Sequence, residues 1–206
     1  MPPRPQLSGR VRTSSTWAPG SLVDWQFHAL GEELIQPFDP SLVNQATVNM
    51  RIGNHLVIEL EELKTRMQHF SRFPWENIGD GLAEVDMTSA TELHPVLIEP
   101  HQWLLTQVAE KVAIPNNFEA QVYLRSSAAR AGWNHATACY VDSGFSGVIT
   151  LELINYRSHK KLKIYPGQEL VQLKVTKLPV YPSSSYKDSG RYFGDTKVQP
   201  SRDQSV

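Results

Sequence analysis

Two arginines and two serines lie close together in the segment 124–130, LRSSAAR, directly after an apolar run. The guanidinium groups of Arg125 and Arg130, the hydroxyls of Ser126 and Ser127 and free backbone N–H groups can all donate hydrogen bonds to one anion. The pattern is therefore typical of a phosphate or oxyanion site. A solvated turn with two surface arginines has the same sequence and is the commoner case.

Glu152 is a lone carboxylate in the apolar segment 148–155, VITLELIN, which is the clearest strand candidate of the chain. Side chains alternate across a strand, so Ile149, Leu151 and Leu153 share one face and Glu152 lies on the other. Burial beside Thr150 and Ile154 would raise the pKa of Glu152, as suits a general base or acid. An exposed strand face at a sheet edge explains the pattern equally well.

Two further segments carry groups that could contact a nucleotide. Asp142 begins the glycine-bounded loop 142–147, where it could form an Asx-turn or hold a sugar hydroxyl or a metal-bound water. The segment 190–197, GRYFGDTK, combines cations, aromatics and glycines. It could fold over a nucleotide or remain a mobile C-terminus.

Composition and missing motifs exclude several kinds of chemistry. The 206 residues carry a formal net charge of -1, so we expect no nucleic-acid or membrane partner that depends on a global charge. A single cysteine, Cys139, provides neither an internal disulfide nor a cysteine-based zinc site. The sequence has no HxE with a later PCxxC, no phosphate-binding glycine motif and no GxSxG, and its seven histidines are scattered.

The spacing of turns predicts an all-β fold. Fourteen prolines against twelve glycines argue against a helical bundle, and short apolar runs between turns favour a sandwich, jelly roll or barrel. We expect a short helix over 21–30, capped by Ser21 and ended by Gly31, and separate strands over 46–52 and 55–60. A charged insertion over 61–81 has room for a short helix.

We divide the chain into a disordered extension (1–20), a β domain (21–180) and a polar tail (181–206), which could close over an active site. Neither a secretory signal nor an apolar run long enough to cross a membrane is present, so we expect a cytoplasmic protein.

Taken in order, five segments resemble the dCTP deaminase branch of the dCTP deaminase/dUTPase family. LIQPFDPSLVNQATVNMRIGN is similar to the family's "I.PF.P..v..aSyDlrlG", and VAIPNNFEAQVYLRSSAARAGW to "v.lP.dl.a...gRSSlaRlGl". HATACYVDSGFSGVITLELIN resembles "h.TAgwiDpGf.G.itLEl.N", IYPGQELVQL resembles "l.pGm.igQl", and RYFGDTKVQPSR resembles "KYqgQ.g...SR". Glu152, ten positions after Asp142, favours the deaminase branch over a plain dUTPase.

The resemblance implies a jelly-roll-like, distorted β-barrel subunit of the dUTPase type that assembles as a homotrimer with active sites between subunits. It implies deamination of dCTP without zinc, with Glu152 as the general base and Arg130 holding the attacking water. The implied nucleotide contacts come from Arg125, Ser126, Ser127, Thr137, Ala138, Asp142, Gln172, Arg191, Tyr192 and Asp195. Mg²⁺ would arrive with the triphosphate, no metal would be held by the protein itself, and dTTP is a candidate feedback inhibitor.

The sequence departs from the family's pattern at several positions. Leu124, Asn49 and Ser143 stand where glycine, aspartate and proline are usual, and Asp195 and Lys197 stand where the tail has glutamine and glycine. An acid at 195 would repel phosphate or alter recognition of the base.

Four functions therefore remain open. The first is a deaminase that releases dUTP and ammonia, and the second is a bifunctional enzyme that continues to dUMP and pyrophosphate. A dUTPase-like pyrophosphohydrolase and a nucleotide-sensing relative without activity are the other two.

Overall fold

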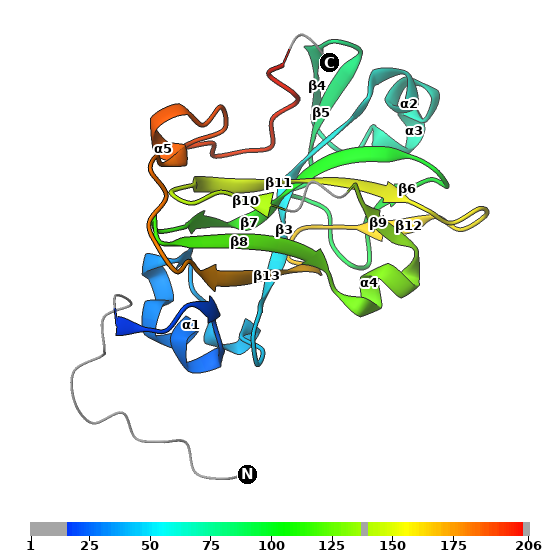
Figure 1. Ribbon diagram of the computed structural model, residues 1–206. Coiled ribbons are helices and arrows are strands. Elements are labelled where there is room, and N and C mark those ends of the chain that lie inside the picture. The colour runs from blue at the N-terminus through cyan, green and yellow to red at the C-terminus, as the bar shows by residue number, and fades with distance from the viewer. Residues whose placement is uncertain (1–15, 137–139, 204–206) are drawn as a thin grey trace, which may run out of the picture.

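The protein is built around one curved antiparallel sheet, described by a computed structural model over residues 16–136 and 140–203 (Figure 1). Its main path runs β10-β8-β13-β3-β7-β11-β9, with β1, β2, β4 and β5 added to the side. β6 and β12 form a separate pair. The strands are β1 (Gly20–Ser21), β2 (Ile35–Gln36), β3 (Val48–Glu59), β4 (Trp75–Gly79), β5 (Leu82–Asp86), β6 (Val96–Ile98), β7 (Trp103–Ala113), β8 (Phe118–Leu124), β9 (Trp133–His135), β10 (Tyr140–Val141), β11 (Ser146–Asn155), β12 (Leu162–Ile164) and β13 (Glu169–Lys177).

The helices that accompany the sheet are all short. They are α1 (Asp24–Leu30), α2 (Leu60–Thr65), α3 (Met67–Phe70), α4 (Ser126–Ala131) and α5 (Tyr186–Ser189), with 3-10 turns η2 (Gly31–Glu33) and η3 (Pro40–Leu42). The all-β prediction is confirmed, and the sheet curls into a half barrel (Figure 1). In the part of the chain that the structure describes, no helix has the length and apolar character needed to cross a membrane.

The N-terminal helix forms three residues later than the sequence predicts. Its N-cap is Val23, while Ser21 belongs to β1 and lies opposite Thr176 of β13. Gly31 ends the helix, as predicted, with a positive φ of 48°. Trp17 lies in the segment predicted to be a disordered extension, yet its side chain is buried in the core. Because Ser21 pairs with β13, it is not available to cap the helix, and the helix begins after Val23.

The prediction of two strands separated at Gly53 is wrong, because β3 runs through this position without a turn. A Cβ atom at Gly53 would lie 2.8 Å from Cγ of Gln107 on β7, so the glycine allows the two strands to approach closely. The register between β3 and β7 shifts between Ile52 and Leu56. The glycine marks an irregularity within one long strand.

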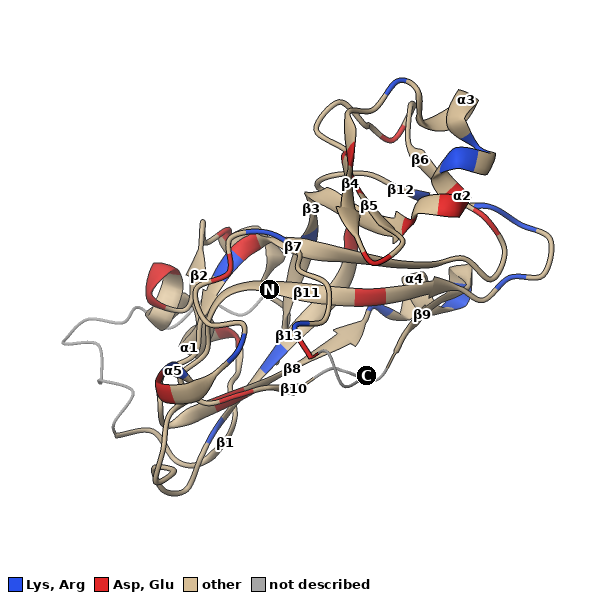
Figure 2. Cartoon of the chain, turned by 90° about the horizontal axis from the view of Figure 1, so that it is seen from above, with Lys and Arg blue, Asp and Glu red and all other residues tan. Residues whose placement is uncertain are grey.

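The charged insertion over 61–81 lies at one end of the sheet, where α2, α3 and β4 project together with the following strand, β5 (Figures 1 and 2). Leu63, Phe70 and Phe73 are buried beneath it. β5 pairs with β3, so the β4–β5 hairpin extends the main sheet. Lys, Arg, Asp and Glu are interspersed along the chain, as the balanced net charge indicates (Figure 2).

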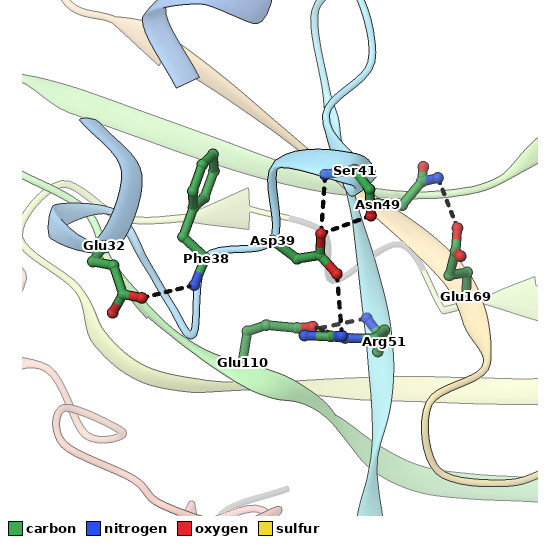
Figure 3. A network of polar contacts seen from close by, with 8 residues as sticks. All are labelled: Glu32, Phe38, Asp39, Ser41, Asn49, Arg51, Glu110 and Glu169. Carbon is green, nitrogen blue, oxygen red and sulfur yellow. Dashed lines mark hydrogen bonds and ion pairs between the residues drawn. The ribbon is translucent and has the colours of Figure 1, made fainter. Parts of the chain in front are cut away.

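A network of charges joins β3 to β7 (Figure 3). Nε of Arg51 donates to the buried Glu110 at 2.6 Å, and the Arg51 backbone N–H donates to the same carboxylate at 3.1 Å. Asp39 lies 3.6 Å from the Arg51 guanidinium, and hydrogen bonds from Ser41 lower the pKa of Asp39. Glu110 is thus a buried charge with a paired partner.

Candidate active site

Glu152 lies in the middle of β11, which pairs with β7 on one side and with β9 on the other. The predicted alternation is confirmed, since Ile149, Leu151 and Leu153 are buried while Glu152 lies on the opposite face with its side chain 28% exposed. Its Oε2 atom is buried without a hydrogen-bond partner. Burial raises the pKa of Glu152 because the charged form loses its hydration.

His135 faces Glu152 from the neighbouring strand, with its Nε2 atom 3.4 Å from Oε2 of Glu152. The imidazole is buried, and this burial lowers the pKa of His135. At neutral pH a neutral imidazole therefore lies beside a carboxyl group that resists ionisation. The sequence prediction that all histidines are scattered missed this residue. The only signal was its place at the start of HATACYVDSGF, the segment that carries Asp142.

The buried carboxyl group predicts how stability depends on pH. A raised pKa means that the folded protein binds more protons than the unfolded chain between the two pKa values of Glu152. Glu152 therefore destabilises the folded protein increasingly as pH rises through this window, and fully above it. We expect Glu152→Gln to raise the Tm at pH 7 by a few degrees, equivalent to about 1 kcal/mol, with no gain at pH 3. Thermal unfolding at both pH values measures this, and an equal shift at both would contradict it.

A pocket of about 530 Å³ lies over the face of β11 that carries Glu152. Of the sequence-predicted site residues, the structure brings Glu152, Asp142, Tyr192 and Asp195 into its lining. The remaining wall is largely aromatic and aliphatic, with Leu82, Trp103, Leu105, Tyr140, Phe145 and Tyr186 among its residues. A hydrogen bond of 2.7 Å to Glu119 raises the pKa of Tyr140 to about 12, so this phenol stays protonated.

Backbone contacts fix the loop that presents Asp142. Gly144 has a positive φ of 83° and its N–H donates to Ile114 at 3.0 Å. The Ser143 hydroxyl donates to the carbonyl of Asn116 at 2.6 Å, and the carbonyl of Ser143 accepts from Tyr186 at 2.9 Å. The loop is therefore held from both sides, by the turn before β8 and by α5 of the C-terminal segment.

The predicted anion-binding residues form a second group at the N-terminal end of α4. Arg125 occupies the N-cap position, Ser126 and Ser127 begin the helix, and Arg130 lies in its last turn. Gln172 lies on β13 and accepts from Thr47 at 3.2 Å. None of these five residues lines the pocket of Glu152. Within one chain, the carboxylates of Asp142 and Glu152 therefore lie in the pocket, whereas the predicted anion-binding arginines and serines lie apart from it at α4.

A chain of polar contacts positions Arg125. Its guanidinium pairs with Glu169 at 2.7 Å, and the Asn49 amide donates to the same carboxylate oxygen at 2.8 Å. Figure 3 shows Asn49 pointing from β3 toward Glu169 on β13. Asn44 in turn donates to Asn49 at 2.9 Å. An amide at position 49 can donate to Glu169, whereas the aspartate usual in the family would repel it.

Ion pairs neutralise the acid in the C-terminal segment. Asp195 pairs with Arg202 at 2.6 Å and its side chain is only 11% exposed. Arg202 also lies over the ring of Tyr192, 5.2 Å from the ring centroid. Arg191, a predicted phosphate contact, pairs with Asp203 at 2.7 Å and does not line the pocket. Asp195 therefore does not present the bare carboxylate that the sequence alone suggests.

Gly147 lets the C-terminal segment approach β11. A Cβ atom at this position would lie 3.0 Å from the carbonyl oxygen of Asp195, and φ is 149°. We expect Gly147→Ala to displace the segment and to reduce the affinity for the nucleotide predicted from the sequence about tenfold, measured by calorimetry. Gly20→Ala is the matched control, because Gly20 has a φ of 134° with no atom within 4 Å of an added Cβ. Equal effects of both substitutions would show that strain alone, rather than contact with the tail, is responsible.

Thr137 and Ala138 lie outside the described residues. Among the residues that are described, no three His, Cys, Asp or Glu side chains gather as a metal site would require. Asp142, Glu152 and Asp195 line one pocket, but these three carboxylates do not gather closely enough to form a metal site, and Asp195 is paired with Arg202.

The curved antiparallel sheet has a counterpart among solved structures. The chain is similar in structure to the 2'-deoxycytidine 5'-triphosphate deaminase of Agrobacterium tumefaciens, with a TM-score of 0.57 over 78% of this chain and 50% of that chain. At 16% identity this match shows the fold alone, and it confirms the predicted dUTPase-like type of sheet.

A family profile described as dCTP deaminase-like matches residues 23–178, and the chain belongs to this family. A protein of Methanoregula boonei is 33% identical over 74% of this chain and 79% of its own length. A protein of Nocardioides sp. is 28% identical over 84% of this chain and 87% of its own. Both relatives bear the name "dCTP deaminase, dUMP-forming".

Proposed function

We propose that this protein deaminates dCTP and then hydrolyses the resulting dUTP, giving ammonia, dUMP and pyrophosphate. The observation that carries the proposal is the position of Glu152, whose buried and unpartnered carboxylate oxygen lies in a pocket shared with Asp142. Membership of the dCTP deaminase-like family and the dUMP-forming names of two relatives support the second step. The bifunctional alternative therefore replaces simple deamination as the favoured function.

In the first step Glu152 takes a proton from a water molecule whose oxygen attacks C4 of the cytosine. The raised pKa of Glu152 suits this work, because the carboxylate accepts the proton and then passes it to N3. A second proton moves from the new hydroxyl to the amino group, the C4–N bond breaks and ammonia leaves. The neutral His135 beside Glu152 adds no positive charge that would lower the basicity of the carboxylate.

In the second step a water molecule near Asp142 attacks the α-phosphorus of dUTP. The bond from this phosphorus to the oxygen bridging to the β-phosphate breaks, so dUMP and pyrophosphate are the products. We also assign to Asp142 the contact with the 3'-hydroxyl of the deoxyribose, and its place in the pocket of Glu152 supports this role. Mg²⁺ enters this proposal as part of the nucleotide substrate, where it offsets the charge of the triphosphate.

The two separate groups of residues fit an active site shared between subunits of a homotrimer. Glu152 and Asp142 would come from one subunit, and Arg125, Ser126, Ser127 and Arg130 from its neighbour. A symmetric ring places the same two surfaces together at every interface. This arrangement supplies arginine side chains to a pocket whose described lining contains neither Arg nor Lys. We place the reaction in the cytoplasm, with the other steps of nucleotide metabolism.

The test is the product ratio. Purified protein with dCTP and Mg²⁺ should release ammonia and pyrophosphate in equal amounts, with dUMP as the nucleotide product. Release of ammonia from dCTP with dUTP as the nucleotide product, and no pyrophosphate, would indicate a simple deaminase. Pyrophosphate from dUTP without ammonia from dCTP would indicate a pyrophosphohydrolase. Binding of both nucleotides without any turnover would favour a nucleotide sensor, and each of these three results would overturn the proposal.

A further inference from the structure

The C-terminal segment extends the sheet on its own subunit. The N–H of Val148 donates to Asp195 at 2.9 Å, and the N–H of Gly194 donates to Ser146 at 2.7 Å. β9 pairs with β11 only over residues 153–155, so the segment occupies the part of this edge that β9 leaves open. The pocket residues Thr150 and Glu152 lie on β11 between the part that contacts the C-terminal segment (146–148) and the part that pairs with β9 (153–155).

Past this edge the segment crosses the outer face of the sheet. Val198 is 1% exposed and packs in a cluster with Val57 and Leu105, against Leu82 and Trp103. Its N–H donates to the side chain of Gln107. Leu82, Trp103 and Leu105 also line the pocket, so Val198 packs directly behind its wall, and the next residues, 199–201, line the pocket themselves.

An ion pair joins the C-terminal segment to the β4–β5 hairpin. Lys197 pairs with Glu84 at 2.7 Å, and the other Glu84 oxygen lies 2.6 Å from Nδ1 of His55. Glu84 belongs to β5 and is 7% exposed. Figure 1 shows the chain running from α5 toward the β4–β5 hairpin. A carboxylate this deeply buried needs its partners, so the loss of Lys197 leaves it under-compensated.

We propose that Glu84 is a positioning residue for the active site. By holding Lys197 on the same subunit, it keeps Tyr192 and Asp195 against the pocket that contains Glu152. The insertion over 61–81 then has a supporting role, since its strand β4 pairs with β5, the strand that carries Glu84. The catalytic consequence rests on the proposed function, whereas the anchoring itself is a property of the nucleotide-free protein.

Hydrogen exchange of the nucleotide-free protein tests the anchor directly. In both Glu84→Gln and Lys197→Met we expect peptides covering 146–150 and 192–199 to exchange about tenfold faster than in the unsubstituted protein. The double variant should exchange no faster than Glu84→Gln alone, because the Lys197–Glu84 pair is already lost in that variant. Lys64→Met is the matched control, because Lys64 pairs with Glu61 at 2.7 Å on the exposed face of the same insertion. Unchanged exchange in Lys197→Met, which leaves the buried core intact, would overturn the proposal.

Steady-state kinetics with dCTP test the consequence. We expect Lys197→Met to raise KM about tenfold with a smaller change in kcat, and Lys197→Arg, which keeps the cation, to restore most of the affinity. If the protein does not turn over dCTP at all, the proposed function fails while the exchange result still decides the anchor. Faster exchange with unchanged KM would contradict the positioning role alone.

Discussion

Glu152→Gln should reduce ammonia release from dCTP by roughly a thousandfold while nucleotide binding changes little. The amide keeps the shape of the side chain and one acceptor oxygen, but it cannot take a proton from water. The buried Oε2 of Glu152 has no hydrogen-bond partner to lose, so the substitution should leave the pocket intact. Coupled detection of ammonia gives the rate, and calorimetric titration with dCTP gives the affinity.

Glu76→Gln is the matched control for this experiment. Glu76 is an exposed carboxylate on β4, so its amide should leave rate and affinity unchanged. A Glu152→Gln variant with an unaltered deaminase rate would remove this residue from the mechanism. A variant that loses binding together with turnover would instead give Glu152 a role in holding the nucleotide.

Mixing two inactive variants should restore activity if subunits share each site. In the proposed homotrimer, Glu152→Gln removes the proposed base and Arg130→Ala removes the proposed guanidinium of α4, so each variant alone should be inactive. In a mixed trimer some sites pair the intact Glu152 of one subunit with the intact Arg130 of its neighbour. Random assortment in equal amounts predicts about a quarter of the original sites. Subunit exchange followed by an ammonia assay measures the recovery.

The recovery separates two arrangements of the site. If Arg130 acts on the pocket of its own chain, every subunit in the mixture carries one defect and no activity returns. Tagged and untagged copies of the unsubstituted protein control for exchange, because untagged subunits are retained with the tag only after subunits have exchanged. Absence of any recovery after proven exchange would contradict the shared site.

The sequence predicts the strands best where local pattern and burial agree. Segment 148–155 alternates strictly and forms β11 with Glu152 on the face opposite Leu151 and Leu153. The pattern fails at Gly53, because a glycine that permits close strand packing looks the same in sequence as one that makes a turn. The position of α1 is also shifted, since Ser21 pairs with β13 in a contact more than 150 residues away in the chain.

The sequence predicts which residue types form the candidate site, but not which side chains contact them. Glu152 and Asp142 lie on one strand and the loop before it, so local sequence brings them together. His135 reaches Glu152 through the pairing of β9 with β11, which no local pattern encodes. The neutralisation of Asp195 depends on Arg202, and the place of Lys197 depends on Glu84 from a distant hairpin. The contacts of Asp195 and Lys197 form only when the C-terminal segment packs back against the sheet.

Turnover of dCTP in H₂¹⁸O, with mass spectrometry of the nucleotide product, tests the central claim most directly. The proposal predicts dUMP that carries one ¹⁸O at the C4 carbonyl of the uracil, from the water activated by Glu152. It also predicts one ¹⁸O on the α-phosphate, from the water activated near Asp142. A product that keeps its amino group and carries ¹⁸O only on phosphate would be dCMP. That result would show hydrolysis without deamination and would contradict the role assigned to Glu152.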